Sequence, residues 1–447
     1  MRLIPTPRPR FALSTLAALL LSGLHGLAPA QSLQELYEAA RAFDATYLGA
    51  KASAQSAEYR AAQADALARP SLSATAGLSH AQTDPTFTGL KNTTTASGSF
   101  NGRYPLFNRA NGVTIEQARK SLLTAQADLD SAEQDLIVRL SQAYFDVLAA
   151  QDTLATTGAS KAAITEQLAS AKRNFEVGTA TITDTREAQA RFDLASAQEI
   201  AAENDLRTKR VSLDTLVGRS DVKPKPLAVP VALPAPVPAN AEEWVTVADQ
   251  QHPTVRRARA GLEVASLEIS KARAAESPTV DAVASLGASD ARGSLPNYSR
   301  SAGTTTVASV GLQLNWPLYT GGLTQNRIKE TLSLEEKARN DLQAARRGVA
   351  QGTRVAYFGV QSGLAQVKAL EAAESSSKLA LEATQLGYKV GVRVNLDVLN
   401  AQTQLFSTQR DLAKARYDVL LGGLKLRLAS GQLLPTDIDA VNRLLAK

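Results

Sequence analysis

Strand-like periodicity occurs at several places along the chain. Over residues 310–318, every second residue is large and apolar, and glycine, glutamine, asparagine and proline stand between them. Residues 100–106 repeat this alternation, and residues 72–78 show a weaker version of it. A period of two predicts β-strands with one apolar face. A soluble sheet with one wet face would give the same pattern, so alternation alone does not place these strands in a membrane.

Long helical segments follow the strand-like stretches. Residues 108–177 contain no proline and predict one helix of about 70 residues, roughly 100 Å long. A matching segment runs to Gly391, and further long helices return from Asp184 and from Asp397. In the last helix, apolar residues recur every seven positions in two adjacent rows, which is typical of a helix that contacts two neighbours. The rows are Leu405, Leu412, Val419 and Leu426, and Leu399, Phe406, Ala413 and Leu420.

The two halves of the sequence repeat each other. Residues 44–70 align with residues 252–278, and later landmarks keep nearly the same spacing as far as residues 174–178 and 387–391. Ordered landmarks at a nearly constant offset predict two copies of one structural unit. In each copy, an alanine-rich helix, strand-like stretches and two long helices follow in the same order.

The repeat also sets the expected domain boundaries. An alanine-rich helix of about 30 residues opens each half, from Leu33 and from Ala241, and ends before Pro70 and Pro278. The proline-rich stretch between the halves is expected to be extended, because proline does not fit a helix interior. We predict a first repeat over residues 31–221, a link over 222–240, a second repeat over 241–430 and a C-terminal segment over 431–447.

The N-terminus is typical of a secretory signal peptide over residues 1–30. Three arginines precede an apolar stretch over residues 11–24, and Ala-Pro-Ala at 28–30 fits the small residues before a cleavage site. Gln31 would then begin the mature chain. A membrane anchor is the alternative, but the apolar stretch is shorter than the roughly 20 residues that a spanning helix needs. Cleavage removes three arginines and no acid, so the formal charge falls from +6 to +3 and gives little support for a nucleic-acid partner.

The composition excludes several classes of active site. The chain has no cysteine, which excludes disulfides, thiolate metal sites, a cysteine nucleophile and a lipid-modified N-terminal cysteine. Three histidines are too few for a histidine-rich metal centre, and neither a catalytic triad nor a phosphate-binding loop is visible. His80 falls in the first hairpin region, and His252 precedes a proline at a helix start, where we expect it to cap. We therefore expect no enzyme, no cofactor and no metal site.

Aromatic residues stand at the ends of the strand-like stretches. They are Tyr104, Phe107, Trp316 and Tyr319. Rings of this kind settle at membrane interfaces. Polar loops over residues 81–95 and 289–306 would be the exposed ends of two hairpins. Four strands are too few for a membrane barrel, which starts at about eight, and open edges are not tolerated in lipid. A membrane sheet here therefore requires several copies of the chain.

Two short turns separate the paired long helices. Gly178 and Gly391 stand where each first helix would end in left-handed backbone, which is a common role of glycine. Asp184, and Asn395 or Asp397, are candidates to cap the helices that follow.

With its repeat, signal peptide and strand pairs, the sequence resembles the TolC family of outer-membrane channel proteins. The most specific parts are the two turns with their flanking helices, NFEVGTATITDTREAQARFDLA from residue 174 and YKVGVRVNLDVLNAQTQLFSTQRDLAKARY from residue 388. The resemblance implies a mostly α-helical homotrimer with a β-barrel portion. Three sets of four strands would form one twelve-stranded outer-membrane barrel, joined to a long coiled-coil tunnel. The link and the C-terminal segment would belong to an equatorial belt around the tunnel.

The resemblance also implies an export function at the outer membrane, with the tunnel extending into the periplasm. Such a duct passes proteins or small toxic compounds from an inner-membrane ABC or proton-driven transporter and a periplasmic adaptor. A soluble periplasmic coiled-coil adaptor is the alternative, but neither an inner-membrane anchor nor a lipoyl-like domain is visible in the sequence. The missing cysteine favours non-acylated ducts, which also serve type I protein secretion, over the lipid-anchored multidrug branch.

Residues at the turns acquire roles from the same resemblance. In the family, tip residues of neighbouring coiled coils bond to one another and hold the inner end of the duct shut. By motif these are Asp184, Tyr388 and Arg393, which we call the latch residues. Asp397 would face a constriction of the lumen, where three carboxylates favour cations. Family members often carry a second acid one turn later, and this chain has Asn400 there. The plainer interpretation of Asp397 is a solvated acid at a helix start.

Overall fold

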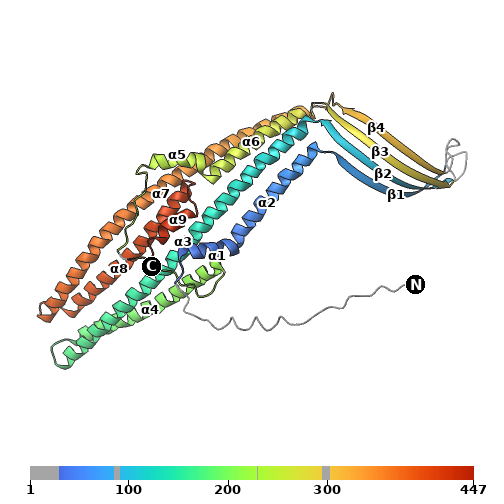
Figure 1. Cartoon of the computed structure of the whole chain (residues 1–447). Helices are drawn as coiled ribbons and strands as arrows, with labels where there is room; N and C mark the ends of the chain where they lie inside the picture. Colours follow the sequence, from blue (N-terminus) through green and yellow to red (C-terminus); the bar gives the residue numbers. More distant parts are fainter. Residues whose placement is uncertain (1–29, 85–90, 229, 294–302, 447) are drawn as a thin grey trace, which may run out of the picture.

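The chain folds into an elongated molecule with a four-stranded sheet at one end and long paired helices at the other (Figure 1). The computed structural model describes residues 30–84, 91–228, 230–293 and 303–446. All of the expected signal peptide except Ala30 lies outside these residues. In chain order the elements are α1 (Leu33–Phe43), α2 (Ala45–Asp65), the 3-10 helix η1 (Ala66–Ala68), β1 (Ser71–Thr83), β2 (Lys91–Phe107), α3 (Arg109–Glu176), α4 (Ile182–Val217), α5 (Ala241–Gln251), α6 (Pro253–Ala274), β3 (Thr279–Gly293), β4 (Gly303–Asn315), α7 (Leu323–Lys389), α8 (Asn395–Ala429) and α9 (Thr436–Asn442).

The sheet is antiparallel, with the order β1-β2-β3-β4, so that β2 of the first half lies beside β3 of the second. The register pairs Phe100 with Leu286 and Ala284 with Val310, which places the even-numbered residues of the four strands on one face. This face is largely apolar near the helices, whereas the odd-numbered residues are mostly serine, threonine, asparagine and glycine. The predicted strands are therefore present, with the predicted alternation.

The two faces of the sheet differ in how open they are. The apolar side chains of Leu72, Val310 and Leu312 are exposed in the single chain. In β3, Leu286 is exposed whereas its polar-face neighbours Ser285 and Gly287 are only partly exposed. Side chains on the inside of a curved surface shield one another, so the polar face is the concave one. The four strands form an open sheet whose outer edges are β1 and β4.

The strands extend further than the alternation indicated. β1 continues to Thr83 and β2 begins at Lys91, so strand replaces much of the loop predicted over residues 81–95. β3 and β4 likewise extend into the loop predicted over 289–306. The side chains there are polar on both faces, so the apolar alternation fades although the backbone pairing continues. Residues 85–90 and 294–302 of these loops lie outside the described residues.

Helices α3 and α7 form the long axis of the molecule. They contain 68 and 67 residues, which corresponds to about 100 Å each at a rise of 1.5 Å per residue. α4 packs along α3, α8 packs along α7, and α6 lies against both long helices. Asn108 caps α3 by accepting a hydrogen bond from the Asn111 backbone N–H at 3.1 Å. No helix in the described part of the chain is apolar over a length that would cross a membrane.

The main hydrophobic core lies at mid-length, where α1, α3, α8 and α9 meet. Tyr144 and Phe145 are buried at its centre, with ring centroids 5.8 Å apart in an edge-to-face arrangement. The Tyr144 hydroxyl donates to the carbonyl of Lys225 at 2.9 Å, which ties the proline-rich link to α3. The link is also fixed to the chain ends, because Pro224 forms a β-bridge with Gln31 and Leu227 forms one with Leu445.

Each predicted alanine-rich helix is broken into two helices. The breaks fall at Asp44 and at His252, which are equivalent positions of the repeat. The Asp44 carboxylate accepts from the Tyr47 backbone N–H at 2.7 Å, and His252 Nδ1 accepts from the Thr254 N–H at 3.1 Å. Each side chain therefore caps the second helix of its pair. The single helices expected from Leu33 and Ala241 were wrong, and the capping role expected of His252 is present.

The pKa of each capping side chain is lowered in the folded protein, for a different reason. The Arg139 guanidinium, which bonds to Asp44 at 3.0 and 3.1 Å, holds the pKa of that carboxyl below its usual range. Burial lowers the pKa of His252. The unfolded chain therefore takes up a proton at His252 before the folded chain does, so the stability contributed by this cap falls as pH drops through about 6.5.

We expect His252→Asp to remove this pH dependence, because aspartate at the equivalent position 44 caps without needing a neutral ring. The melting temperature of the wild type should fall between about pH 7.5 and 5.5, a window above the range in which carboxylates titrate. His252→Asp should flatten this fall, whereas the control His80→Gln, on the sheet, should retain it. A wild-type melting temperature that is the same at both pH values would contradict the assignment.

Candidate functional site

The end of the molecule opposite the sheet consists of two turns with the same backbone. Gly178 has φ +78° and Gly391 has φ +80°, so both stand in left-handed conformation as predicted. The backbone N–H of Gly178 donates to the carbonyl oxygen of Phe175 at 3.0 Å, and that of Gly391 donates to the carbonyl oxygen of Tyr388 at 3.1 Å. A Cβ added at either glycine would meet nothing within 4 Å, so the backbone angle and not the available space is what requires glycine.

The helices that leave these turns begin in different ways. Thr181 caps α4, and Asp184 reciprocates by accepting from the Thr181 N–H at 2.9 Å. Asp184 is thus at the N3 position of a capping box, and Thr181 is the N-cap residue. At the second turn Val394 holds the cap position without a side-chain bond, so neither Asn395 nor Asp397 caps α8 as expected. The side chain of Asn395 is buried and bonds instead to Gln167 on α3.

The latch residues are all near the turns, but each has a separate partner within the single chain. Tyr388 accepts a hydrogen bond from Asn174 Nδ2 at 3.0 Å. Arg393 Nη1 lies 3.6 Å from Asp397 Oδ2, which makes a loose, exposed ion pair. Among the described residues no hydrogen bond or ion pair joins Asp184 to Tyr388 or to Arg393.

Asn400 belongs to a contact between the two helical hairpins. Arg191 Nη2 on α4 donates to Asn400 Oδ1 on α8 at 3.0 Å. Beside it, Leu399 is fully buried in a small core with residues of α3 and α4. The remaining members of that core are Ile164, Leu168, Ala171, Ala188 and Ala195. The two hairpins of one chain are therefore packed against each other close to the turns.

The side-chain contacts that join the two helical hairpins were not predicted from the sequence. Asn174 lies at the repeat position of Gly387, so a departure from the repeat was the one signal available for its bond to Tyr388. Gly387 has a steric role of its own, because a Cβ there would lie 2.8 Å from Cγ of Arg393. Partners such as Arg191 and Asn400, 209 residues apart, carry no local signal at all.

At the other end of the molecule the sheet joins the helices (Figure 1). The four predicted interface aromatics lie at or just after the ends of β2 and β4 that lead into the long helices. All four are exposed, although large rings are normally buried in a water-soluble domain. They are Tyr104, Phe107, Trp316 and Tyr319. Gly321 and Gly322, both with positive φ, turn the chain from β4 into α7. Among the described residues no cluster of potential metal ligands occurs.

Similarity to known proteins extends along nearly the whole chain. The family model described as Outer membrane efflux protein matches residues 36–219 and 244–432, which are the two halves of the repeat. The chain belongs to the outer membrane efflux protein family. Outer membrane protein TolC of Vibrio cholerae is 32% identical over 416 residues, which cover 92% of this chain and 93% of that protein. Proteases secretion protein PrtF of Dickeya chrysanthemi is 30% identical over 438 residues, or 95% and 93% of the two chains.

Among solved structures, outer membrane protein VceC of Vibrio cholerae has a TM-score of 0.75 and covers 89% of this chain and 96% of its own. At 19% identity this likeness concerns the fold, which is that of an outer membrane efflux protein with a helical tunnel and a barrel portion. The predicted family, fold class and outer-membrane location are confirmed. The protein is an outer-membrane export duct, and the alternative of a soluble adaptor is set aside. The family comprises efflux channels, which are not enzymes.

Proposed function

We propose that three copies of this chain form one continuous duct through the outer membrane and the periplasm. The observation that carries this proposal is the open sheet, with its exposed apolar face and its two edges, β1 and β4. In lipid, each unpaired backbone group at an edge costs several kcal/mol. Pairing β4 of one copy with β1 of the next removes every edge and closes twelve strands. The interface aromatics would then ring the barrel on its periplasmic side.

The helices support the same assembly. Side chains that a single soluble chain would bury are exposed along the outer surfaces of the long hairpins. They include Ile200, Val211, Val355, Leu379 and Leu386. Neighbouring copies would cover these side chains and complete a tunnel of about 100 Å. In this arrangement residues 222–240 and 431–447 form the equatorial belt, and residues 31–221 and 241–430 form the two repeats. The described parts of the two belt segments pack against the core at mid-length.

The turns are the proposed contact with the rest of an export system. Apolar side chains at both turns are exposed, an arrangement that favours a protein partner over water. They are Val177, Ile182, Val390, Val392 and Val394. We assign this end to a periplasmic adaptor, which links the duct to an inner-membrane ABC or proton-driven transporter. The transporter supplies the energy, and the duct itself needs no cofactor, metal or nucleic acid.

The cargo that we favour is protein. The relative PrtF, which matches along almost its full length, is named a proteases secretion protein. The chain also has no cysteine to which a lipid anchor of the multidrug branch could be attached. Small toxic compounds are the second candidate cargo. A deletion strain compared with its parent for secreted proteins and for drug sensitivity separates the two.

At the turns, the latch residues provide the closing contacts between copies. Within the described part of one chain, the ion pair of Arg393 is the loose one with Asp397, so its exposed guanidinium can also meet a carboxylate or phenol of a neighbour. An exposed link of this type is worth about 0–1 kcal/mol, so a threefold set can break and reform. Asp397 then adds a ring of three carboxylates that favours cations, and the neutral Asn400 keeps that ring weak.

A planar-bilayer recording tests the duct and its latch together. The purified wild type should insert as a trimer and conduct ions, and a monodisperse species that is soluble without detergent would overturn the proposal. Tyr388→Phe combined with Arg393→Ser should raise the single-channel conductance, because it removes the phenol and guanidinium that hold the turns together.

The matched control is Tyr59→Phe with Arg60→Ser, which makes the same two changes on the exposed surface of α2. This control should leave the conductance at its wild-type value. A double variant at the turns that conducts like the wild type would remove the latch role from Tyr388 and Arg393.

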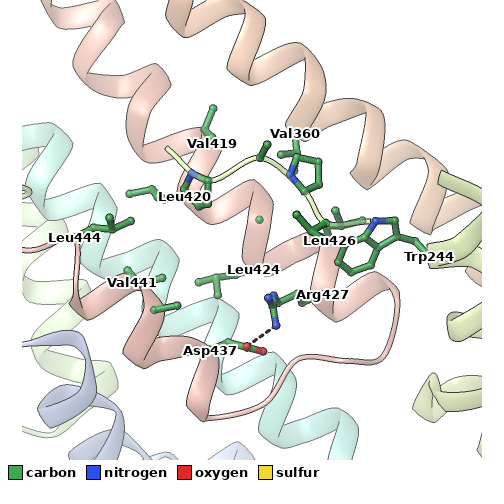
Figure 2. Close-up of a pocket in the computed structure, with 16 residues that line it drawn as sticks. Trp244, Val360, Val419, Leu420, Leu424, Leu426, Arg427, Asp437, Val441 and Leu444 are labelled. Carbon is green, nitrogen blue, oxygen red and sulfur yellow. Dashed lines mark hydrogen bonds and ion pairs between the residues drawn. The ribbon is translucent and has the colours of Figure 1, made fainter. Parts of the chain in front are cut away.

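A cavity in the belt is a separate feature (Figure 2). It has a volume of about 320 Å³ and lies between the proline-rich link, α8 and α9. Trp244 and Leu426 contribute apolar walls, and the Arg427–Asp437 ion pair, at 2.6 Å, closes one side. The Trp244 indole donates to the Pro238 carbonyl at 2.8 Å and so fixes the link over the cavity. We assign it a structural role in the belt.

A further inference from the structure

Near the helices, the concave face of the sheet carries one unexpected pair of charges. The odd-numbered residues over 71–83, 93–105, 279–293 and 303–315 form this face, and nearly all of them are small or neutral polar residues. Arg103 on β2 and Asp281 on β3 are the charged residues among these positions. They lie near the end of the sheet that joins the helices.

The two charges are in very different surroundings. Arg103 Nη2 donates to Asp281 Oδ2 at 2.6 Å. The Asp281 side chain is only 5% exposed, whereas the Arg103 side chain is 61% exposed. Asp281 Oδ1 is buried without a hydrogen-bond partner. The carboxylate is thus held behind the guanidinium, which presents its free N–H groups to the open side of the concave face.

The difference in exposure between Asp281 and Arg103 determines the position of the arginine and the sign of the charge that faces the concave side. A buried carboxylate with one unsatisfied oxygen depends on its single ionic partner, so Asp281 holds Arg103 in one place. An ion that passes over the concave face comes closer to the exposed guanidinium than to the carboxylate behind it, so its Coulomb interaction with the guanidinium is the larger one. Seen from the concave side, the pair therefore acts as a positive group.

We propose that Arg103 is a charge-selectivity residue of the duct and that Asp281 is its positioning residue. The inference rests on the proposed trimer, in which the concave polar face lines the lumen of the barrel. β2 is an inner strand of its sheet, so neighbouring copies at β1 and β4 leave Arg103 uncovered. Three copies place three guanidinium groups around the mouth where the barrel joins the tunnel. A ring of arginines favours anions, which is opposite in sign to the Asp397 ring at the turns.

Reversal potentials across a KCl gradient test this proposal, with the dilute side at about 0.1 M. Arg103→Gln removes the exposed charge and leaves Asp281, so the chloride-to-potassium permeability ratio should fall by at least about twofold. Asp281→Asn removes the buried charge and leaves Arg103, so the ratio should move in the opposite direction. The control Arg292→Gln removes an arginine that is more exposed still, at 84%, from the other face of the sheet on β3, and it should leave the ratio unchanged.

Each outcome separates the inference from the function on which it rests. A wild type that forms no channels would overturn the trimeric duct itself. If the wild type conducts and both Arg103→Gln and Asp281→Asn have its permeability ratio, only the selectivity role is overturned. In that case a lowered melting temperature of both variants would identify the pair as a structural clamp between β2 and β3. Opposite shifts in the permeability ratio have no such structural explanation, and they support the proposal.

Discussion

Replacing Leu312 with arginine should prevent the duct from inserting into membranes. Leu312 lies near the middle of the apolar stretch of β4, and its side chain is 73% exposed in the single chain. Arginine on the lipid face of a barrel costs up to about 2–4 kcal/mol, the value at the bilayer midplane, and less toward the interfaces. In a trimer this penalty is incurred three times, because every copy places the same residue in the lipid.

Gln313→Arg is the matched control for this variant. Gln313 is the next residue of β4 and lies on the opposite, concave face, so the same charge would face water. We expect Gln313→Arg to insert as the wild type does, whereas Leu312→Arg should remain outside lipid vesicles as unfolded or aggregated protein. Flotation with vesicles and gel mobility with and without heating measure both variants. Equal insertion of the two would show that the faces of the sheet have been assigned the wrong way round.

The second large effect is expected in the belt, where Ile438→Ala should destabilise the fold by about 2–5 kcal/mol. Ile438 on α9 is fully buried in the main core, beside α1 and the C-terminal part of α8. Truncation removes its apolar contacts and leaves a cavity that the rigid long helices cannot fill by moving. The cost should appear as a lower melting temperature of the detergent-solubilised protein.

Leu434→Ala provides the comparison, because Leu434 belongs to the same C-terminal segment but is 58% exposed. This change should alter the stability by no more than about 0.5 kcal/mol. Trp244 is buried in a core with residues of α7 and α8 and lines the cavity that α9 also borders, so its fluorescence reports on the belt. If both variants melt together with the wild type, the C-terminal segment does not contribute to the core in the assembled protein.

Periodicity was enough to predict the main elements of the fold. The helix expected over residues 108–177 is α3, Arg109–Glu176, since a cap and a glycine turn bound it closely on either side. The breaks at Asp44 and His252 were not predicted, because alanine-rich sequence continues on both sides of each cap. A capping side chain ends one helix and starts another only if the chain must bend there. That need comes from packing against α3 at Asp44 and from packing against α7 at His252.

The backbone of the turns could be predicted from the sequence, whereas side-chain pairs between distant residues could not. Gly178 and Gly391 are local features, and their left-handed backbone was predictable from position alone. The pair formed by Arg103 and Asp281 was not, because those residues are 178 positions apart and meet only through the register of β2 on β3. The same is true of Tyr388, whose partner Asn174 is 214 positions away.

The pairing of β2 with β3 has a consequence for symmetry. Within one chain it joins the two repeats as the proposed pairing of β4 with β1 joins successive chains, so the closed ring is close to sixfold in its backbone. Its side chains are only threefold: the repeat counterpart of Arg103 is Asn315, and that of Arg393 is Ala180. At each pair of equivalent positions, the residue of one repeat can therefore serve ion selectivity or gating, while its counterpart in the other repeat keeps only the shared backbone structure.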